Sequence, residues 1–565
     1  MTAMTSIGAR SRTRCIAFGA VIALFALSSC SSDPEDGGSS TVGGVGGSGA
    51  GGPGPVYDDF PEDPIIEDGL PADLPGLFAG APGSDSGGPC LSEPAIDAMI
   101  PKNWTPLLFE WAPPADQNVF ELRLRVDNQQ NELVAYTSSP TFTIPAATWK
   151  SLAAHSAGHD VEITLRGATL SGGSLTSGPF TGASGVVHLA PVEAPGSVVY
   201  WTSSDNTSFQ GFVIGDPTPV TVLTPPMAGP TSTGGTTTCV SCHTSSPDGK
   251  LVVYSRDADD GTRAIDIRMV DGSGAPQAAD VSPAALALLG RSKQTAPLMS
   301  PAHYAAGDAV AISVLEDATL TAGRSELAWT DLHAADASGW GILTRTGDPG
   351  EVSSPSWRHD GGAVAYVSSD IASEGVIADA PQGGNMDIYV VPYNDRAGGA
   401  AMPLPGASDA AFREFYPVYS PSDALLAFNR TDQPVSSYNQ PSAEVFVLPA
   451  EGGQPLRLAA NDPPACTGLT SPGITNSWAR WAPQAGDEGS KRYYWLVFSS
   501  KRRALSSGAD GLLPQLYIAA VVTTVVDGVE TIEKDYPALY VTSQIPTQNN
   551  HTPAWDFFEV QSIPK

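Results

Sequence analysis

The sequence has few positive charges and no hydrophobic run long enough to cross a bilayer. It carries 29 Lys and Arg residues against 60 Asp and Glu, a formal net charge of −31. Nucleic acid and anionic lipid surfaces repel a body of that charge, so neither is an expected partner. The main apolar run, Cys15 to Leu27, is shorter than the roughly 20 residues of a membrane-spanning helix. A transmembrane anchor is therefore not expected.

Cysteine is scarce, and the common hydrolase motifs are absent. Only six cysteines occur, and the sequence contains neither G-x-S-x-G nor H-E-x-x-H. Without these motifs, the sequence gives no indication that the protein is a hydrolase. Charged residues make up only 16% of the chain, whereas Gly (59) and Pro (50) are abundant. That balance favours many strands joined by many turns.

The first residues have the pattern of a bacterial lipoprotein signal. Three arginines precede the apolar run, as in a signal peptide. The run ends in Leu27-Ser28-Ser29-Cys30, which resembles the lipobox. The resemblance implies that residues 1–29 are removed and that Cys30 is lipidated, anchoring the chain to a membrane. An ordinary secretory signal is the alternative, and both readings predict export.

Loss of the three arginines with residues 1–29 lowers the net charge from −31 to −34. Ser31 follows Cys30 where the inner-membrane retention signal places Asp, so the resemblance favours the outer membrane. An oxidising compartment permits disulfides, and Cys90 with Cys466 is one hypothetical pair.

Two further segments precede the longest part of the chain. Residues 30–89 consist largely of Gly, Ser, Pro and Asp, which predicts a disordered tether. Residues 90–191 alternate apolar and polar side chains, most clearly in Phe120–Val126 and Val161–Leu165. Strands of that pattern predict a small β-sandwich that looks like an immunoglobulin or fibronectin type III module.

A diverged repeat occupies residues 192–565. Each copy has an entry motif with an aromatic residue, an Asp or Gly turn and an apolar strand. The entries include Ser246-Pro247-Asp248-Gly249, Ser300-Pro301, Ser354-Pro355-Ser356-Trp357, Tyr416-Pro417-Val418-Tyr419 and Trp478-Ala479-Arg480-Trp481. The turn positions Gly249, Gly307, Gly361 and Asp423 are 58, 54 and 62 residues apart, enough for a four-stranded blade each.

These motifs resemble the WD40-like repeat of TolB-type β-propellers. The resemblance implies an all-β fold with a six-bladed propeller, closed by a strand at Thr552-Pro553-Ala554-Trp555. It also implies an envelope protein whose loop-lined face binds another protein or an envelope polymer. We expect Trp357, Tyr419, Trp481 and Trp555 to pack between blades.

One motif carries recognisable chemistry. Cys239-Val240-Ser241-Cys242-His243 is a C-x-x-C-H sequence, the pattern that attaches haem c through two thioethers and an axial imidazole. A local disulfide between Cys239 and Cys242, or binding of another metal, are the alternatives. Met299 is a candidate sixth ligand to haem iron, and His303 is a second; both could instead be structural.

Two functions follow from these features. The first is a non-catalytic binding or scaffold module held at the envelope. The second is a haem protein that acts in electron transfer or haem-dependent redox chemistry. An enzyme that uses acidic residues at the propeller channel ranks third, since only the general acidity of the chain favours it.

Overall fold

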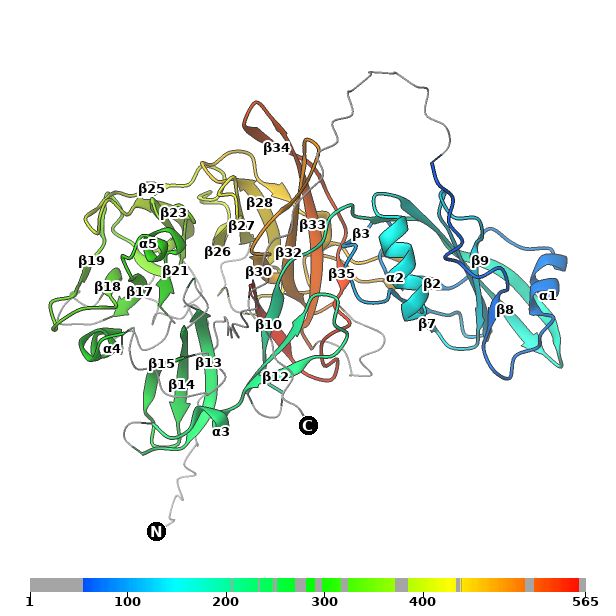
Figure 1. Ribbon diagram of the computed structural model, residues 1–565, viewed down its shortest axis with the longest axis horizontal. Helices are drawn as coiled ribbons and strands as arrows, with labels where there is room; N and C mark the ends of the chain where they lie inside the picture. The colour runs from blue at the N-terminus through cyan, green and yellow to red at the C-terminus, as the bar shows by residue number, and fades with distance from the viewer. Residues whose placement is uncertain are drawn as a thin grey trace, which may run out of the picture.

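Two β-rich regions follow each other along the chain (Figure 1). The computed structural model describes residues 54–204, 207–231, 234–245, 247, 251–269, 281–289, 297–316, 324–370, 385–432, 437, 439–502 and 513–557. The signal peptide, Cys30 and the tether up to residue 53 lie outside the described residues. None of the described helices has the length and apolar character that crossing a membrane requires.

The N-terminal region contains a six-stranded sheet, in the order β1-β6-β5-β8-β9-β3, and a three-stranded sheet, β2-β4-β7. The strands are β1 Ile65–Ile66, β2 Cys90–Glu93, β3 Met99–Ile100, β4 Leu108–Ala112, β5 Val119–Arg125, β6 Leu133–Thr137, β7 Thr141–Thr143, β8 Asp160–Ser171 and β9 Ser174–Leu189. Trp111 of β4 meets Phe120 of β5 edge to face, with ring centroids 5.5 Å apart. The two sheets therefore share one core.

The predicted alternation is present in β5, where Leu122 and Leu124 are buried and Arg125 is exposed. The segment around Trp149, in contrast, forms helix α2, Ala146–His155. Alanine-rich sequence favours a helix, and Trp149, Leu152 and Ala153 lie on its buried face at helical spacing.

The ordered body begins earlier than the tether prediction implies. Residues 54–89 include helix α1, Leu74–Gly80, and pack against the strands of the N-terminal region. Phe60 is buried in its core, while Leu74 and Phe78 pack with Val119 and Tyr136. A few widely spaced apolar side chains are enough to dock this Pro- and Asp-rich segment, and its composition hides them.

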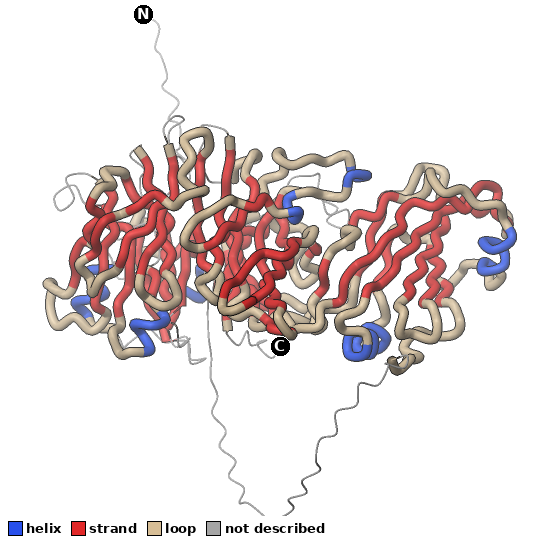
Figure 2. The backbone as a smooth tube through the Cα atoms, turned by 90° about the horizontal axis from the view of Figure 1, so that it is seen from above, coloured by secondary structure: helices blue, strands red, loops and turns tan. Residues whose placement is uncertain are grey.

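The larger region contains successive antiparallel sheets, which we number from first to sixth. The first is β12-β11-β10-β36, the second β13-β14-β15, the third β16-β17-β18-β19, the fourth β21-β22-β23-β25, the fifth β26-β27-β28-β29 and the sixth β30-β32-β33-β34. In Figure 2 their strands stand side by side in one thick layer, with loops on both sides.

The bounds in the first three sheets are β10 Ser197–Thr202, β11 Ser208–Val213, β12 Val220–Leu223, β36 Asn550–Asp556, β13 Thr237–Ser245, β14 Leu251–Ala258, β15 Arg263–Met269, β16 Leu298–Met299, β17 Val310–Glu316, β18 Ser325–Asp331 and β19 Trp340–Ile342. Three short helices accompany them: α3 Pro225–Ala228, α4 Pro283–Leu289 and α5 Pro301–Ala305.

The bounds in the last three sheets are β21 Glu351–Trp357, β22 Ala363–Ser369, β23 Met386–Pro392, β25 Met402–Pro403, β26 Arg413–Tyr419, β27 Leu425–Thr431, β28 Glu444–Pro449, β29 Leu456–Arg457, β30 Ser477–Trp481, β31 Gly486–Glu488, β32 Lys491–Ser500, β33 Gln515–Val526, β34 Val529–Asp535 and β35 Leu539–Tyr540. The remaining elements are β20 Thr344–Thr346, which pairs with β24 Gly398–Ala400, and the 3-10 turns η2 Ala459–Asn461 and η3 Ala465–Thr467.

The last described strand joins the first sheet. Strand β36 pairs antiparallel with β10, so that Trp555 lies opposite Val198. This pairing brings the two ends of the larger region together and leaves fewer open sheet edges. The all-β fold class and the propeller are confirmed. The immunoglobulin-like connectivity stays a prediction, as does a count of six complete blades, because three strands of the second sheet are described.

The two regions are joined by polar and covalent links. Cys90 of β2 and Cys466 of η3 form a disulfide with Cα atoms 5.6 Å apart, the pair that the sequence analysis proposed. Asn103 exchanges two 2.9 Å hydrogen bonds with the backbone of Ala194. Lys534 donates to Asp97 across 2.9 Å. A single apolar cluster also runs from the sandwich into the first and sixth sheets.

Candidate functional site

The C-x-x-C-H motif lies on β13, the leading strand of the second sheet. Here "leading strand" means the strand that begins each sheet at its entry motif: β13, β16, β21, β26, β30 and β36. Strand β13 pairs with β14, and the register shifts between Ser241 and His243. The motif is therefore part of a sheet and lies on no helix.

A register shift recurs in most leading strands. Strands β21, β26, β30 and β36 each shift register within the entry motif. In these strands Ser354, Tyr416, Trp478 and Thr552 have positive φ angles of 46°, 57°, 62° and 46°. Such a shift is a β-bulge, which bends the strand and re-aims its side chains. Cys242 occupies the corresponding place in β13, so the motif is built on a structural feature of the repeat.

His243 is sealed inside the protein. It is 1% exposed, and its ring centroid lies 3.8 Å from that of Phe209 in the first sheet. Neither ring nitrogen has a hydrogen-bond partner among the described residues. Burial holds the pKa of His243 well below its usual range, so the imidazole is neutral at physiological pH.

Cys239 is also buried, at 1% exposure, and its sulfur is part of a disulfide. The side chain of Cys242 lies outside the described residues, as do Cys15 and Cys30. Attachment of haem c needs both thiols free and an open face beside the imidazole. With the Cys239 sulfur in a disulfide and the His243 ring packed against Phe209, the residues of β13 as folded do not fit haem.

The candidate axial ligands have other surroundings. Met299 is 7% exposed and belongs to an apolar cluster with Val253 and Ile267. His303 lies 3.0 Å from the carbonyl oxygen of Gly361 through Nε2, and its ring meets Tyr393 edge to face. In the part of the chain that the structure describes, no group of three or more His, Cys, Asp and Glu could hold a metal ion.

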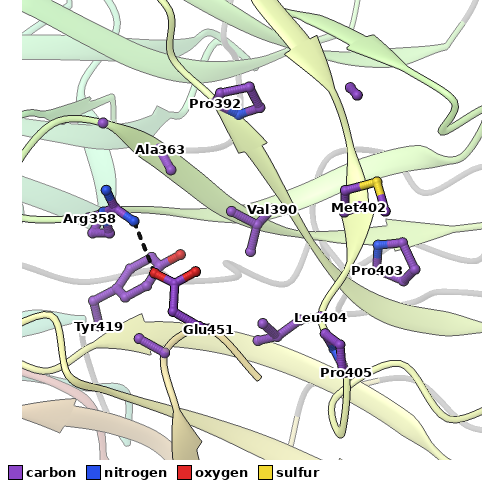
Figure 3. Close-up of a pocket in the computed structure, with 13 residues that line it drawn as sticks. Arg358, Ala363, Val390, Pro392, Met402, Pro403, Leu404, Pro405, Tyr419 and Glu451 are labelled. Atoms are coloured by element: carbon purple, nitrogen blue, oxygen red, sulfur yellow. Dashed lines mark hydrogen bonds and ion pairs between the residues drawn. The ribbon is translucent and has the colours of Figure 1, made fainter. Parts of the chain in front are cut away.

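A second candidate site is a pocket between the fourth and fifth sheets, which we call the inter-sheet pocket (Figure 3). Its volume is about 370 Å³. Apolar side chains supply most of its wall, among them Val390, Pro392, Met402, Pro403 and Leu404. Met402 is 62% exposed. An apolar cavity with a few polar groups is typical of a binding site.

The polar side of the inter-sheet pocket is formed by Arg358, Glu451 and Tyr419. Arg358 donates to Glu451 across 3.2 Å, as the dashed line in Figure 3 marks, and it donates two bonds of 2.7 and 2.8 Å to Asp360. The guanidinium lowers the pKa of Asp360 below its usual range. Glu451 is 87% exposed at the rim.

Tyr419 is 2% exposed, yet its hydroxyl makes no hydrogen bond to any described residue. In Figure 3 this hydroxyl points toward the pocket from the ring beside Glu451. Burial raises the pKa of Tyr419, so the phenol stays protonated. The site therefore offers an unused donor at the end of an apolar cavity.

Tyr419 marks an exception within the repeat. Trp357, at the equivalent position of the fourth sheet, donates from its indole N–H to the carbonyl of Leu298 in the third sheet, at 3.0 Å. Trp481 of the sixth sheet donates in the same way to Val418 of the fifth, at 3.2 Å. Phenol has no equivalent N–H and is smaller than indole. The pocket lies at the junction where Tyr replaces Trp.

The repeat pattern predicts that all of these aromatic side chains pack between sheets, and it gives no indication of the inter-sheet pocket. The signal that could have indicated it is the Tyr at a position where the neighbouring fourth and sixth sheets have Trp357 and Trp481. The partners of Tyr419, Arg358 and Glu451, lie 61 and 32 residues from it along the chain. Their proximity depends on the pairing of two sheets.

The chain was compared with family models, curated proteins and solved structures. No family model matches the sequence, and no curated protein is similar to it. Solved structures do match. The chain is similar to TolB-type and other β-propellers.

Two of these structures are TolB proteins. The one from Agrobacterium tumefaciens is 14% identical, covers 63% of this chain and 95% of its own, and has a TM-score of 0.32. The one from Acinetobacter baumannii is 12% identical over 73% and 85%, with a TM-score of 0.23. The lectin BP39L from Burkholderia pseudomallei is 12% identical over 67% and 95%, with a TM-score of 0.27.

Proposed function

We propose that this chain is a non-catalytic binding protein of the bacterial envelope, anchored through lipid on Cys30, whose propeller holds a protein or envelope polymer. The inter-sheet pocket is the observation that supports this function best. It is apolar, it carries an unused hydroxyl donor, and it opens at the exposed Met402.

The anchor part of the proposal rests on the sequence around Cys30. We expect Cys30→Ala to abolish incorporation of labelled palmitate and to release the protein from the membrane fraction. Ser31→Asp serves as the sorting variant and should move the lipidated protein from outer- to inner-membrane fractions. Unchanged membrane association of Cys30→Ala would overturn the lipid anchor.

The binding part can be tested in cells. A photo-crosslinking amino acid at Met402 should give a discrete crosslinked product, because this side chain lies at the mouth of the inter-sheet pocket. Lys150, exposed on α2 of the sandwich, is the control position. Equal products at both positions, or none at Met402, would contradict binding at this site.

Haem at Cys239, Cys242 and His243 remains the alternative proposal. The two unpartnered nitrogens of His243 are in its favour, because a buried imidazole without a partner is costly. The disulfide at Cys239 and the packing of Phe209 argue against it. Full-length protein made together with the haem-attachment machinery should be colourless and have the mass of the apoprotein. A Soret band with the mass of covalent haem would replace the binding function by a redox one.

A further inference from the structure

The inter-sheet pocket differs from the neighbouring junctions in a way that bears on its ligand. At the junction between the fifth and sixth sheets the indole of Trp481 donates to the carbonyl of Val418 and links the two sheets. At the junction between the fourth and fifth sheets Tyr419 leaves both a cavity and a hydroxyl without a partner. The Tyr419 ring is buried, whereas its hydroxyl is accessible from the pocket and is free to donate to a ligand that enters it.

The size of the cavity limits what can enter. Its volume of about 370 Å³ is near the lower end of the roughly 300–1,000 Å³ of small-ligand sites. The wall of Val390, Pro392 and Leu404 offers no hydrogen-bonding side chains. One large apolar side chain, with the backbone that carries it, suits this space better than a sugar or a nucleotide.

The negative charge at the rim of the pocket favours a basic residue next to that apolar side chain in the ligand. Arg358 is shared by the carboxylates of Asp360 and Glu451, which leaves one negative charge in excess. Glu451 is 87% exposed, so its second oxygen is open to a cation. The whole chain is also strongly acidic, which accelerates encounters with basic partners.

We propose that the inter-sheet pocket binds an extended polypeptide by one large apolar anchor side chain flanked by a basic residue. The apolar anchor fills the cavity beside Val390 and Leu404. The ligand backbone carbonyl next to the anchor accepts the hydrogen bond that the Tyr419 hydroxyl donates. The flanking cation pairs with Glu451. This inference rests on the proposed binding function and names the class of partner.

The test uses nine-residue Gly- and Ser-rich peptides with three central residues varied. One peptide carries Lys-Leu-Lys, the second Glu-Leu-Glu and the third Lys-Ala-Lys. Their affinities for the full-length lipidated protein in detergent micelles are measured by calorimetry. We expect Lys-Leu-Lys to bind at least tenfold more tightly than either of the others. Equal affinities would overturn the inference.

Three variants locate the binding. Glu451→Lys should reverse the preference between the Lys and Glu peptides, whereas Glu488→Lys, an equally exposed change on β31, should not. Tyr419→Phe removes only the hydroxyl and should weaken Lys-Leu-Lys by roughly three- to tenfold. Melting temperatures report whether each variant is folded. Binding that none of the pocket variants alters would place the peptide elsewhere and overturn the inference.

Failure of this inference can be told from failure of the proposed function. If a crosslinked partner forms at Met402 in cells but no peptide binds, the binding function stands and the ligand class is wrong. Binding of a soluble glycan strand without peptide binding has the same meaning. If no crosslinked product forms at Met402 and no peptide binds, both the binding function and the peptide inference are wrong.

Discussion

Two junctions between sheets differ by one aromatic residue. Between the fifth and sixth sheets the indole of Trp481 donates to the carbonyl of Val418 and links the two sheets. Between the fourth and fifth sheets Tyr419 occupies the same repeat position, and a pocket of about 370 Å³ lies beside it. The difference teaches that this repeat keeps its architecture with either residue, while the indole forms a hydrogen bond across the junction that the phenol does not form.

The largest effect is expected from removing the indole of Trp481 between the fifth and sixth sheets. Trp481→Ala should lower the free energy of unfolding by about 3–5 kcal/mol, because it removes a large buried side chain and leaves a cavity. The Val418 carbonyl also loses its donor. Urea unfolding of the full-length protein measures the change. A loss of less than about 1 kcal/mol would show that Trp481 does not hold the two sheets together.

The disulfide at η3 gives the fifth sheet a second attachment, to the sandwich. The double variant Cys90→Ser with Cys466→Ser should lower the free energy of unfolding by about 2–4 kcal/mol, since the bond closes a loop across a sequence separation of 376 residues. The measurement is urea unfolding under non-reducing conditions. The single free thiols that would confuse the result are absent from the double variant. An unchanged midpoint would show that the noncovalent contacts suffice.

The N-terminal region contains a buried acidic residue, Glu93 of β2. Burial raises the pKa of Glu93 to about 8 from its usual 4.5, although the Tyr540 amide donates to its carboxylate. The folded state therefore retains a proton that the unfolded state releases. The stabilisation is fully present below pH 4.5 and is lost as the pH rises toward 8, by up to about 1.4 kcal/mol per pH unit.

We expect Glu93→Gln, which cannot ionise, to flatten this dependence. The free energy of unfolding at pH 5 minus that at pH 8 should be smaller in the variant than in the parent. Glu488→Gln, on an exposed strand, is the matched control. The same pH slope in both proteins would exclude Glu93 as its source.

The smallest effect on stability is expected from introducing Trp at position 419, between the fourth and fifth sheets. Tyr419→Trp places indole where the neighbouring fourth and sixth sheets have it, at Trp357 and Trp481, so we expect a change within about 1 kcal/mol in either direction. Peptide binding should fall by more than tenfold as the ring occupies the cavity. Calorimetry with the Lys-Leu-Lys peptide, together with a melting curve, checks both. Full retention of binding would show that the pocket does not depend on residue 419.

Much of the fold could be predicted from local pattern. Alternation in β5 and the spacing of the turn at Gly361 reflect contacts within one strand or one sheet, which sequence displays directly. Helix α2 was not predicted, because the alternation of residues 90–191 indicated strands throughout, whereas its alanine-rich sequence favours a helix. The burial of Phe60 in the core could not be predicted from the sequence, because a single apolar residue in a polar segment shows no periodicity.

The site was less predictable than the fold. The C-x-x-C-H motif was recognised from its spacing, but spacing does not show whether a histidine faces a cavity or a phenylalanine. Phe209 lies in another sheet, 34 residues before His243. The chemistry of His243 is thus decided by a neighbour that the motif does not contain.

The sequence by itself determined the acidic character of the chain, the β repeat and the strand at Trp555 that joins the first sheet, since each follows from residue type and order. Tertiary structure decided which aromatic positions are closed and which leave space. Tyr419 shows the physical reason. Its ring size and its hydroxyl are properties of one residue, but a pocket exists only because Arg358, Val390 and Glu451 of two sheets are brought around it.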